Sequence, residues 1–146
     1  MQTSRELFRQ HSLRCTTQRL AVYDALRFSR CHPTAEQLFR IVQKDGDAPS
    51  LATIYNTLDA LCEAGLVRRH PTTNGCCRYD ADTSSHVHMR FPDTAEIEDV
   101  PIEVSQRIQA LLPADLLQQV AHQLGVDIDG LSIQLIARRR CPVVDP

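Results

Sequence analysis

Residues 50–80 constrain the fold more than any other part of this 146-residue chain. Apolar residues recur there at spacings of three and four, on one face of a helix that Ser50 can cap: Leu51, Ile54, Leu58 and Leu61. Gly65 ends this helix, and two short strand patterns follow, separated by the turn sequence at 71–75. A helix of this length needs tertiary packing for stability. The pattern therefore predicts a small helical domain that carries a β-hairpin.

The sequence before residue 50 supplies the helices that such a domain needs. Periodicity and capping residues predict helices over 3–11 and from Thr16 or Thr17 to Phe28. A third helix opens at Thr34, where Gln37 completes a capping box. We expect it to end at 44–47 and to bury three apolar residues: Leu38, Ile41 and Val42.

The polar face of the helix at 50–61 is suited to nucleic acid. It carries four side chains that can contact phosphates and base edges: Thr53, Tyr55, Asn56 and Thr57. Three arginines add positive charge to the hairpin, where we expect them along the DNA backbone: Arg68, Arg69 and Arg78. A solvated helix face looks similar in isolation, but the order of helices and hairpin favours a winged helix-turn-helix.

The charge differs between the two halves of the chain. Residues 1–80 have eleven Lys/Arg and eight Asp/Glu, whereas residues 81–146 have five and ten. A cationic first half suits a polyanionic partner, and an acidic second half suits metal or subunit contacts. No stretch is apolar enough for a membrane span or a signal peptide, so we expect a cytoplasmic protein without a membrane partner.

His86 and His88 are the clearest chemical signal in the second half. On a strand, residues two apart face the same way, so both imidazoles can meet a carboxylate of the acidic stretch 96–99. Nitrogen and oxygen ligands of this kind suit a borderline metal. The six cysteines form no Cys-x-x-Cys pair, and Cys76 and Cys77 are either redox-active or small buried hydrophobes.

The second half has the pattern of a small, separate domain. Strands are expected over 86–91 and 95–100, a helical region broken near Pro113 over 103–124, and a third strand over 130–137. The chain thus reads as α+β, with a DNA-binding domain at 1–82, a hinge at 83–85 and an α/β domain with a three-stranded sheet at 86–146. About 65 residues give a small core, which favours homodimerisation.

The motifs, taken in order, resemble the ferric uptake regulator family of metal-dependent transcription factors. The matching elements span most of residues 14–100: Arg14-Cys15-Thr16-Thr17-Gln18-Arg19, His32-Pro33-Thr34-Ala35-Glu36, Ala52-Thr53-Ile54-Tyr55-Asn56-Thr57-Leu58, Leu61-Cys62-Glu63-Ala64-Gly65-Leu66-Val67, Arg78-Tyr79-Asp80 and His86-Val87-His88. The resemblance implies an N-terminal winged helix, a hinge, a C-terminal dimerisation domain and a homodimer bound to double-stranded operator DNA.

The resemblance also implies site residues. One divalent metal per subunit, Fe²⁺ or Mn²⁺ in the cell and Zn²⁺ as a further candidate, falls on five ligands across the hinge: His32, Asp80, His86, His88 and Asp99. A shift of one residue would exchange Asp99 for Glu98. The implied DNA contacts are Arg14, Arg19, Tyr55 and Asn56, to which Ser50 and Thr53 are added from the helix itself.

The chain departs from the family pattern at the structural zinc site. Phe91 and Thr94 stand where the first Cys-x-x-Cys pair is common, and only Cys141 is available for the second. We therefore expect no structural zinc and a buried Phe91. The family often has Arg where this chain has Asn56, so its operator preference does not transfer.

The ligand set leaves the signal open. An aspartate at position 99 resembles the peroxide-sensing branch, in which iron-dependent oxidation of His32 or His86 would release the repressor from DNA. The alternative is a plain iron, manganese or zinc uptake regulator. A metalloenzyme is disfavoured because no general base or small-molecule substrate site stands out. A metal-independent DNA-binding protein is the third hypothesis, and metal dependence of operator binding separates them.

Overall fold

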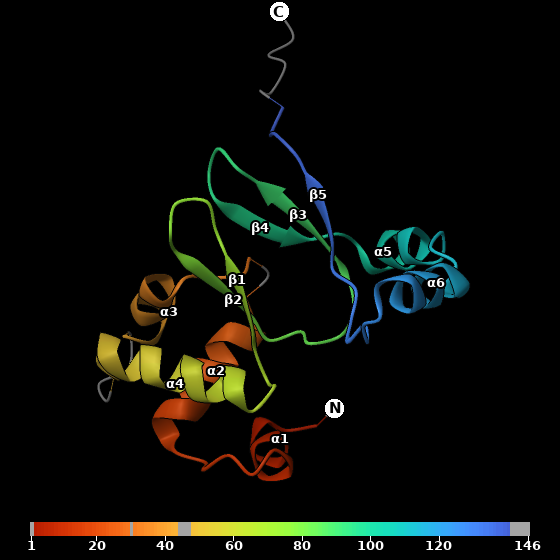
Figure 1. Cartoon of the computed structure of the whole chain (residues 1–146). Coiled ribbons are helices and arrows are strands. Elements are labelled where there is room, and N and C mark those ends of the chain that lie inside the picture. Colours follow the sequence, from red (N-terminus) through yellow and green to blue (C-terminus); the bar gives the residue numbers. More distant parts are fainter. Residues whose placement is uncertain (1, 30, 44–47, 141–146) are drawn as a thin grey trace, which may run out of the picture. The chain divides into compact units, whose positions relative to one another are not determined.

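The computed structural model describes residues 2–29, 31–43 and 48–140 (Figure 1). The chain divides into two compact units, Met1–Thr83 (unit 1) and Ser84–Pro146 (unit 2). The boundary falls inside the segment 83–85 that the sequence marks as a hinge. No helix in the described ranges is long and apolar enough to cross a membrane.

Unit 1 contains four helices followed by a hairpin. The helices are α1 (Ser4–Gln10), α2 (Thr17–Arg27), α3 (Ala35–Val42) and α4 (Leu51–Glu63). A hydroxyl side chain caps the start of each helix. It accepts a hydrogen bond from the backbone N–H of the residue three positions later, and the four capping residues are Thr3, Thr16, Thr34 and Ser50. The predicted capping box of Thr34 and Gln37 is confirmed, whereas the predicted helix end at 44–47 lies outside the described residues.

The hairpin of unit 1 follows α4 after a glycine. Gly65 has φ 71°, a left-handed conformation that favours glycine and ends the helix. Strands β1 (Arg68–Pro71) and β2 (Cys77–Asp80) then pair antiparallel, with Arg68 opposite Asp80 and His70 opposite Arg78. The predicted hairpin is therefore present at the predicted place.

The core of unit 1 packs the helices on one another and on β2. Ile54, Leu58 and Leu61 of α4 are fully buried. Two predictions were wrong: Ile41 is 46% exposed, and Thr57 is only 3% exposed. Each residue turns about 100° around a helix axis, so Ile41 and Thr57 both lie about 60° from a fully buried residue of their helix, Leu38 and Ile54. The packing of neighbouring elements, which differs between the two flanks, therefore decides which one is covered.

Unit 2 is a three-stranded sheet with two helices. Its elements are β3 (Val87–Phe91), β4 (Glu96–Asp99), α5 (Ile102–Gln109), α6 (Ala114–Leu124) and β5 (Ile133–Ile136). The order is β4-β3-β5, antiparallel between β3 and β4 and parallel between β3 and β5 (Figure 1). Pro113 separates the two helices, as expected. The described residues therefore confirm a mixed α and β fold.

Apolar side chains of unit 2 are largely exposed. Of the fifteen large hydrophobic side chains that are exposed among the described residues, twelve lie in this unit: Ile102, Val104, Leu111, Leu112, Leu116, Val120, Leu124, Val126, Ile128, Leu131, Leu135 and Ile136. Leu131, before β5, and Leu135, within it, are 41% and 37% exposed.

Candidate metal centre

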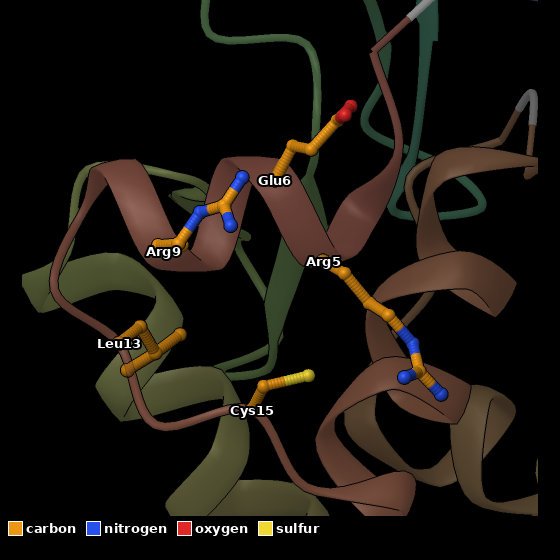
Figure 2. Close-up of a pocket in the computed structure, with 5 residues that line it drawn as sticks. All are labelled: Arg5, Glu6, Arg9, Leu13 and Cys15. Carbon is orange, nitrogen blue, oxygen red and sulfur yellow. The ribbon is translucent and has the colours of Figure 1, made fainter.

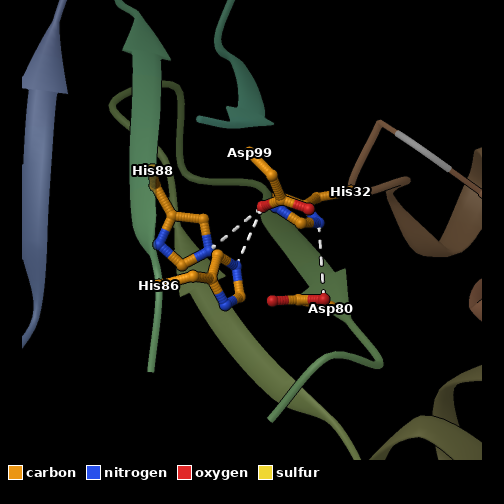
Figure 3. Close-up of side chains that lie close together, drawn as sticks. All are labelled: His32, Asp80, His86, His88 and Asp99. Atoms are coloured by element: carbon orange, nitrogen blue, oxygen red, sulfur yellow. Dashed lines mark hydrogen bonds and ion pairs between the residues drawn. The ribbon is translucent and has the colours of Figure 1, made fainter. Parts of the chain in front are cut away.

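In unit 1, β2 fixes His32 beside Asp80. The backbone N–H of Tyr79 donates to the carbonyl of Pro33 at 3.1 Å, which ties β2 to the segment before α3. His32 Nδ1 then lies 3.7 Å from Asp80 Oδ1, and the two side chains are 3% and 5% exposed (Figure 3). The N–H of Asp82 donates to the same Asp80 oxygen at 2.7 Å. An imidazole and a carboxylate are thus held together in a buried place.

Arg78 has a different role from the predicted one. It is 7% exposed, and its Nη1 donates to the carbonyl of His32 at 2.8 Å and to Gln37 Oε1 at 3.4 Å. It therefore does not lie on the outside of the hairpin, where a DNA backbone would pass. Alternation along β2 directs Tyr79 into the hydrophobic core and places Arg78 on the same face as Asp80, where its guanidinium positions His32 instead.

In unit 2, Asp99 faces both histidines. His88 is directly opposite Asp99 across β3 and β4, and its Nε2 lies 3.6 Å from Asp99 Oδ1. His86 Nε2 lies 2.9 Å from the same oxygen (Figure 3). The rings of His86 and His88 are 4.3 Å apart, and both residues are buried. The two imidazoles expected to share a face do so, and they share it with a carboxylate.

The hydrogen bonding of His86 indicates a positive charge at this place. Its Nδ1 lies 3.0 Å from the carbonyl of Ser84, which can only accept, so Nδ1 carries the proton. A neutral ring then presents the Nε2 lone pair to the Asp99 carboxylate. These two acceptors are compatible when a proton or a cation lies between them. Ligand atoms on adjacent octahedral positions with metal bonds of about 2.1 Å lie roughly 3.0 Å apart, so the donors fit a metal ion.

The choice between Asp99 and Glu98 follows from β4. Adjacent strand residues face opposite ways, so Glu98 points away from the histidines. Glu98 Oε1 and Glu96 Oε2 accept from Arg139 at 2.5 and 3.0 Å. The guanidinium of Arg139 also lies over the ring of Phe91, 4.5 Å from its centroid, and Phe91 is 7% exposed. Phe91 is therefore buried as expected, whereas Cys141 lies outside the described residues.

The predicted DNA contacts gather at one concave surface of unit 1. A cavity of about 240 Å³ is lined by Arg14, Thr16, Gln18, Arg19, Thr53, Asn56 and Thr57. It joins the start of α2 to the middle of α4, and Arg19 Nη1 donates to the carbonyl of Arg14 at 3.0 Å. Four of the six predicted residues therefore lie together: Arg14, Arg19, Thr53 and Asn56.

The other two predicted DNA contacts lie outside this cavity lining. Ser50 caps α4, with its Oγ 3.1 Å from the N–H of Thr53. The Tyr55 hydroxyl donates to Glu36 Oε1 at 2.5 Å, and this contact raises the pKa of Tyr55 to about 12. The Tyr55 side chain is tied to α3 while the residue stays 40% exposed.

A second cavity, of about 470 Å³, lies along α1 and contains none of the predicted residues (Figure 2). It is lined by Arg5, Glu6, Arg9, Leu13 and the exposed Cys15. The Glu6 carboxylate accepts the N–H of Thr3 at 2.9 Å in the capping box of α1. Sequence reasoning gave no signal for this cavity, because no chemical motif connects the residues that line it.

Each of the two units brings imidazole and carboxylate side chains together, and these side chains can bind a metal ion. This arrangement is typical of a metal-responsive regulator. Residues 10–127 match the model of the ferric uptake regulator family. The chain belongs to the ferric uptake regulator family, whose members are metal-responsive, DNA-binding transcription regulators and not enzymes.

Both peroxide-responsive repressors and ferric uptake regulators are similar to this chain. The peroxide-responsive repressor PerR of Staphylococcus saprophyticus is 33% identical over 91 residues, which cover 62% of each protein. The ferric uptake regulation protein of Brucella abortus is 25% identical over 132 residues, 90% of this chain and 88% of that protein. The ferric uptake regulator of Pseudomonas aeruginosa with manganese matches at a TM-score of 0.68 and 25% identity, over 97% of this chain and all of that one.

Proposed function

We propose that one divalent cation is shared by the two donor sets and clamps the hinge at 83–85. Unit 1 would supply His32 and Asp80, and unit 2 would supply His86, His88 and Asp99. Two or three protein ligands leave a site open, whereas five nearly complete an octahedral shell for Mn²⁺ or Fe²⁺. The observation that carries the proposal is His86, whose Nε2 and the Asp99 carboxylate face each other at 2.9 Å.

A shared cation would act by selecting one mutual orientation of the units. Ligands on both sides of a hinge bind tightly only in the orientation that brings them together, so the metal shifts the population toward it. When bound, the metal would supply a positive charge that the neutral imidazole nitrogens and the two carboxylates coordinate. In a dimer, this orientation would set the spacing between two recognition helices.

We propose that unit 1 binds DNA as a winged helix-turn-helix, with α3 and α4 as the helix pair and β1-β2 as the wing. Helix α4 would enter the major groove, where the Asn56 amide can pair with adenine. Arg14 and Arg19 border the same concave surface, where Arg14 would enter the minor groove and Arg19 would contact phosphate. Arg69 forms an ion pair with Asp59, so its guanidinium is less available to contact phosphate from the wing.

We also propose a homodimer formed through unit 2. Leu116, Val120 and Leu124 form a stripe along α6 at spacings of four residues, and all three are exposed. Ile136 of β5, an edge strand, is 78% exposed. A second copy of the chain would cover these surfaces on both subunits, because a two-fold interface pairs like with like.

The test of the proposed function is metal-dependent DNA binding by the full-length protein. A duplex is selected from a random pool with Mn²⁺ present, and its affinity is then measured by fluorescence anisotropy with Mn²⁺ or with EDTA at one salt concentration. We expect metal to tighten binding by about 5- to 150-fold, the usual range of allosteric coupling. Equal affinity in both conditions would exclude the clamp.

The same complex distinguishes a peroxide sensor from a plain uptake regulator. The aspartate ligand and the similarity to a peroxide-responsive repressor favour the first. Protein loaded with Fe²⁺ is treated with dilute peroxide and analysed by peptide mass spectrometry. One added oxygen on a peptide containing His32 or His86, together with loss of DNA, is expected of a sensor. An unmodified protein that stays on DNA would identify an uptake regulator.

Asn56→Ala is expected to weaken binding to the selected duplex by about 5- to 150-fold, because the amide would no longer pair with a base. Arg19→Gln should instead weaken binding to all sequences and lower the salt slope by about one. Arg40→Gln is the matched control, since it removes the same charge from an exposed site on α3 outside the cavity. Equal effects of Arg19→Gln and Arg40→Gln would indicate general attraction and exclude a contact at this surface.

A further inference from the structure

His70, which no motif in the sequence singles out, contacts both proposed metal donors of unit 1, His32 and Asp80. It lies in β1, and its Nε2 is 3.9 Å from Asp80 Oδ2. Its ring stacks on the ring of His32, with centroids 5.7 Å apart and planes inclined by 26°. The side chain is 12% exposed, so these contacts lie mostly out of solvent.

We infer that His70 is a positioning residue for the metal, which holds His32 and Asp80 in the arrangement that binds a cation. The inference rests on the proposed function of these two residues as ligands. It goes beyond that function because it places the affinity of the site partly in the first strand of the hairpin. No ligand role is assigned to His70.

The strand register explains how His70 reaches Asp80. Arg68 is directly opposite Asp80, and His70 is two residues further along β1 on the same face. His70 and Asp80 are therefore diagonal neighbours, a separation that long and aromatic side chains bridge. Arg78, which is directly opposite His70, holds the backbone of His32 from the other strand. Both strands of the hairpin thus contribute to the position of His32.

The two oxygens of Asp80 have different neighbours. Oδ1 faces His32 and accepts the N–H of Asp82, whereas Oδ2 is the oxygen on the side of His70. At 3.9 Å the contact with His70 is electrostatic and steric, since it is longer than a hydrogen bond. It limits rotation of the carboxylate, as the stack limits rotation of the His32 ring. Loss of such outer contacts typically costs about 10- to 100-fold in metal affinity.

Mn²⁺ titration of the full-length protein tests the inference. His70→Ala is expected to raise the Kd for Mn²⁺ by about 10- to 100-fold. His70→Phe keeps an aromatic ring against His32 but has no nitrogen near Asp80, so it should recover part of this loss. His122→Ala removes an exposed histidine of α6 and should change nothing. Wild-type affinity in His70→Ala would overturn the inference, and wild-type affinity in His70→Phe would overturn the role of the Asp80 contact.

Two further measurements separate a positioning role for His70 from a ligand role and from a general loss of folding. The absorption spectrum of the Co²⁺-loaded protein should keep its band positions in His70→Ala at saturating metal, because the ligands are unchanged. New band positions would make His70 a ligand and overturn the inference. The thermal midpoint of the metal-free variants shows whether each is folded, and His70→Phe decides if His70→Ala is not. If His86→Ala also keeps full affinity, the proposed site itself fails; if only His70→Ala keeps it, the positioning role fails alone.

Discussion

His86→Ala and Asp99→Ala are each expected to lower the affinity for Mn²⁺ by roughly 100-fold or more, about 3 kcal/mol. The reason is that each removes a donor from the closest contact of unit 2, in which His86 Nε2 and Asp99 Oδ1 are 2.9 Å apart. Metal-dependent DNA binding should be lost in both variants, while the weak binding seen in EDTA is retained. Isothermal titration with Mn²⁺ and anisotropy on the selected duplex give the two numbers.

Glu98→Ala is the matched control for Asp99→Ala. It removes the neighbouring carboxylate, which contacts Arg139 on the other face of β4. Metal affinity should stay at the wild-type value. The proposed ligand set is wrong if Glu98→Ala loses metal and Asp99→Ala does not, because the strand would then face the other way.

The double variant Leu116→Glu/Val120→Glu is expected to dissociate the dimer. Each subunit would bring two carboxylates into an apolar interface, and a buried charge without a partner costs about 3 to 5 kcal/mol. The dimer Kd should rise by at least about 1,000-fold. Sedimentation velocity at micromolar concentration would then show a monomer, and affinity for a two-fold symmetric duplex should fall with it.

Gln118→Glu tests whether charge on α6 is harmful in itself. Gln118 is exposed and lies about 200° around the helix from Leu116, on the opposite side from the apolar stripe. This variant should remain a dimer. A double variant that is still dimeric at micromolar concentration would show that subunits associate through another surface, and the exposed residues of α5 and β5 would then be the next to test.

Predictions from the sequence were most accurate where the determining interactions are local. The capping box of Thr34 and Gln37, the stop at Gly65 and the break at Pro113 each depend on residues within a few positions of one another. The shared face of His86 and His88 was predictable for the same reason, because it follows from the geometry of a single strand. The resemblance added His32, Asp80 and Asp99, which no spacing alone could connect to that pair.

Predictions failed where a side chain's direction depends on distant packing. Arg78 was expected outside the hairpin but lies against the carbonyl of His32. Ile41 and Thr57 exchange their expected exposure, because a small rotation of a helix decides which flank of the stripe is covered. These outcomes depend on how α3, α4 and β2 fit together, and no local pattern contains that information.

By itself, the sequence determined which segments form helices and strands, and that imidazoles and carboxylates are the available donors, because backbone hydrogen bonding and side-chain periodicity act over a few residues. Only the tertiary structure decided that Asp99 and not Glu98 faces the histidines, that Arg78 and His70 hold His32, and that four of the predicted DNA contacts share one cavity. Those facts depend on strand register and helix phase. Both are fixed by the packing of residues that are far apart in the chain.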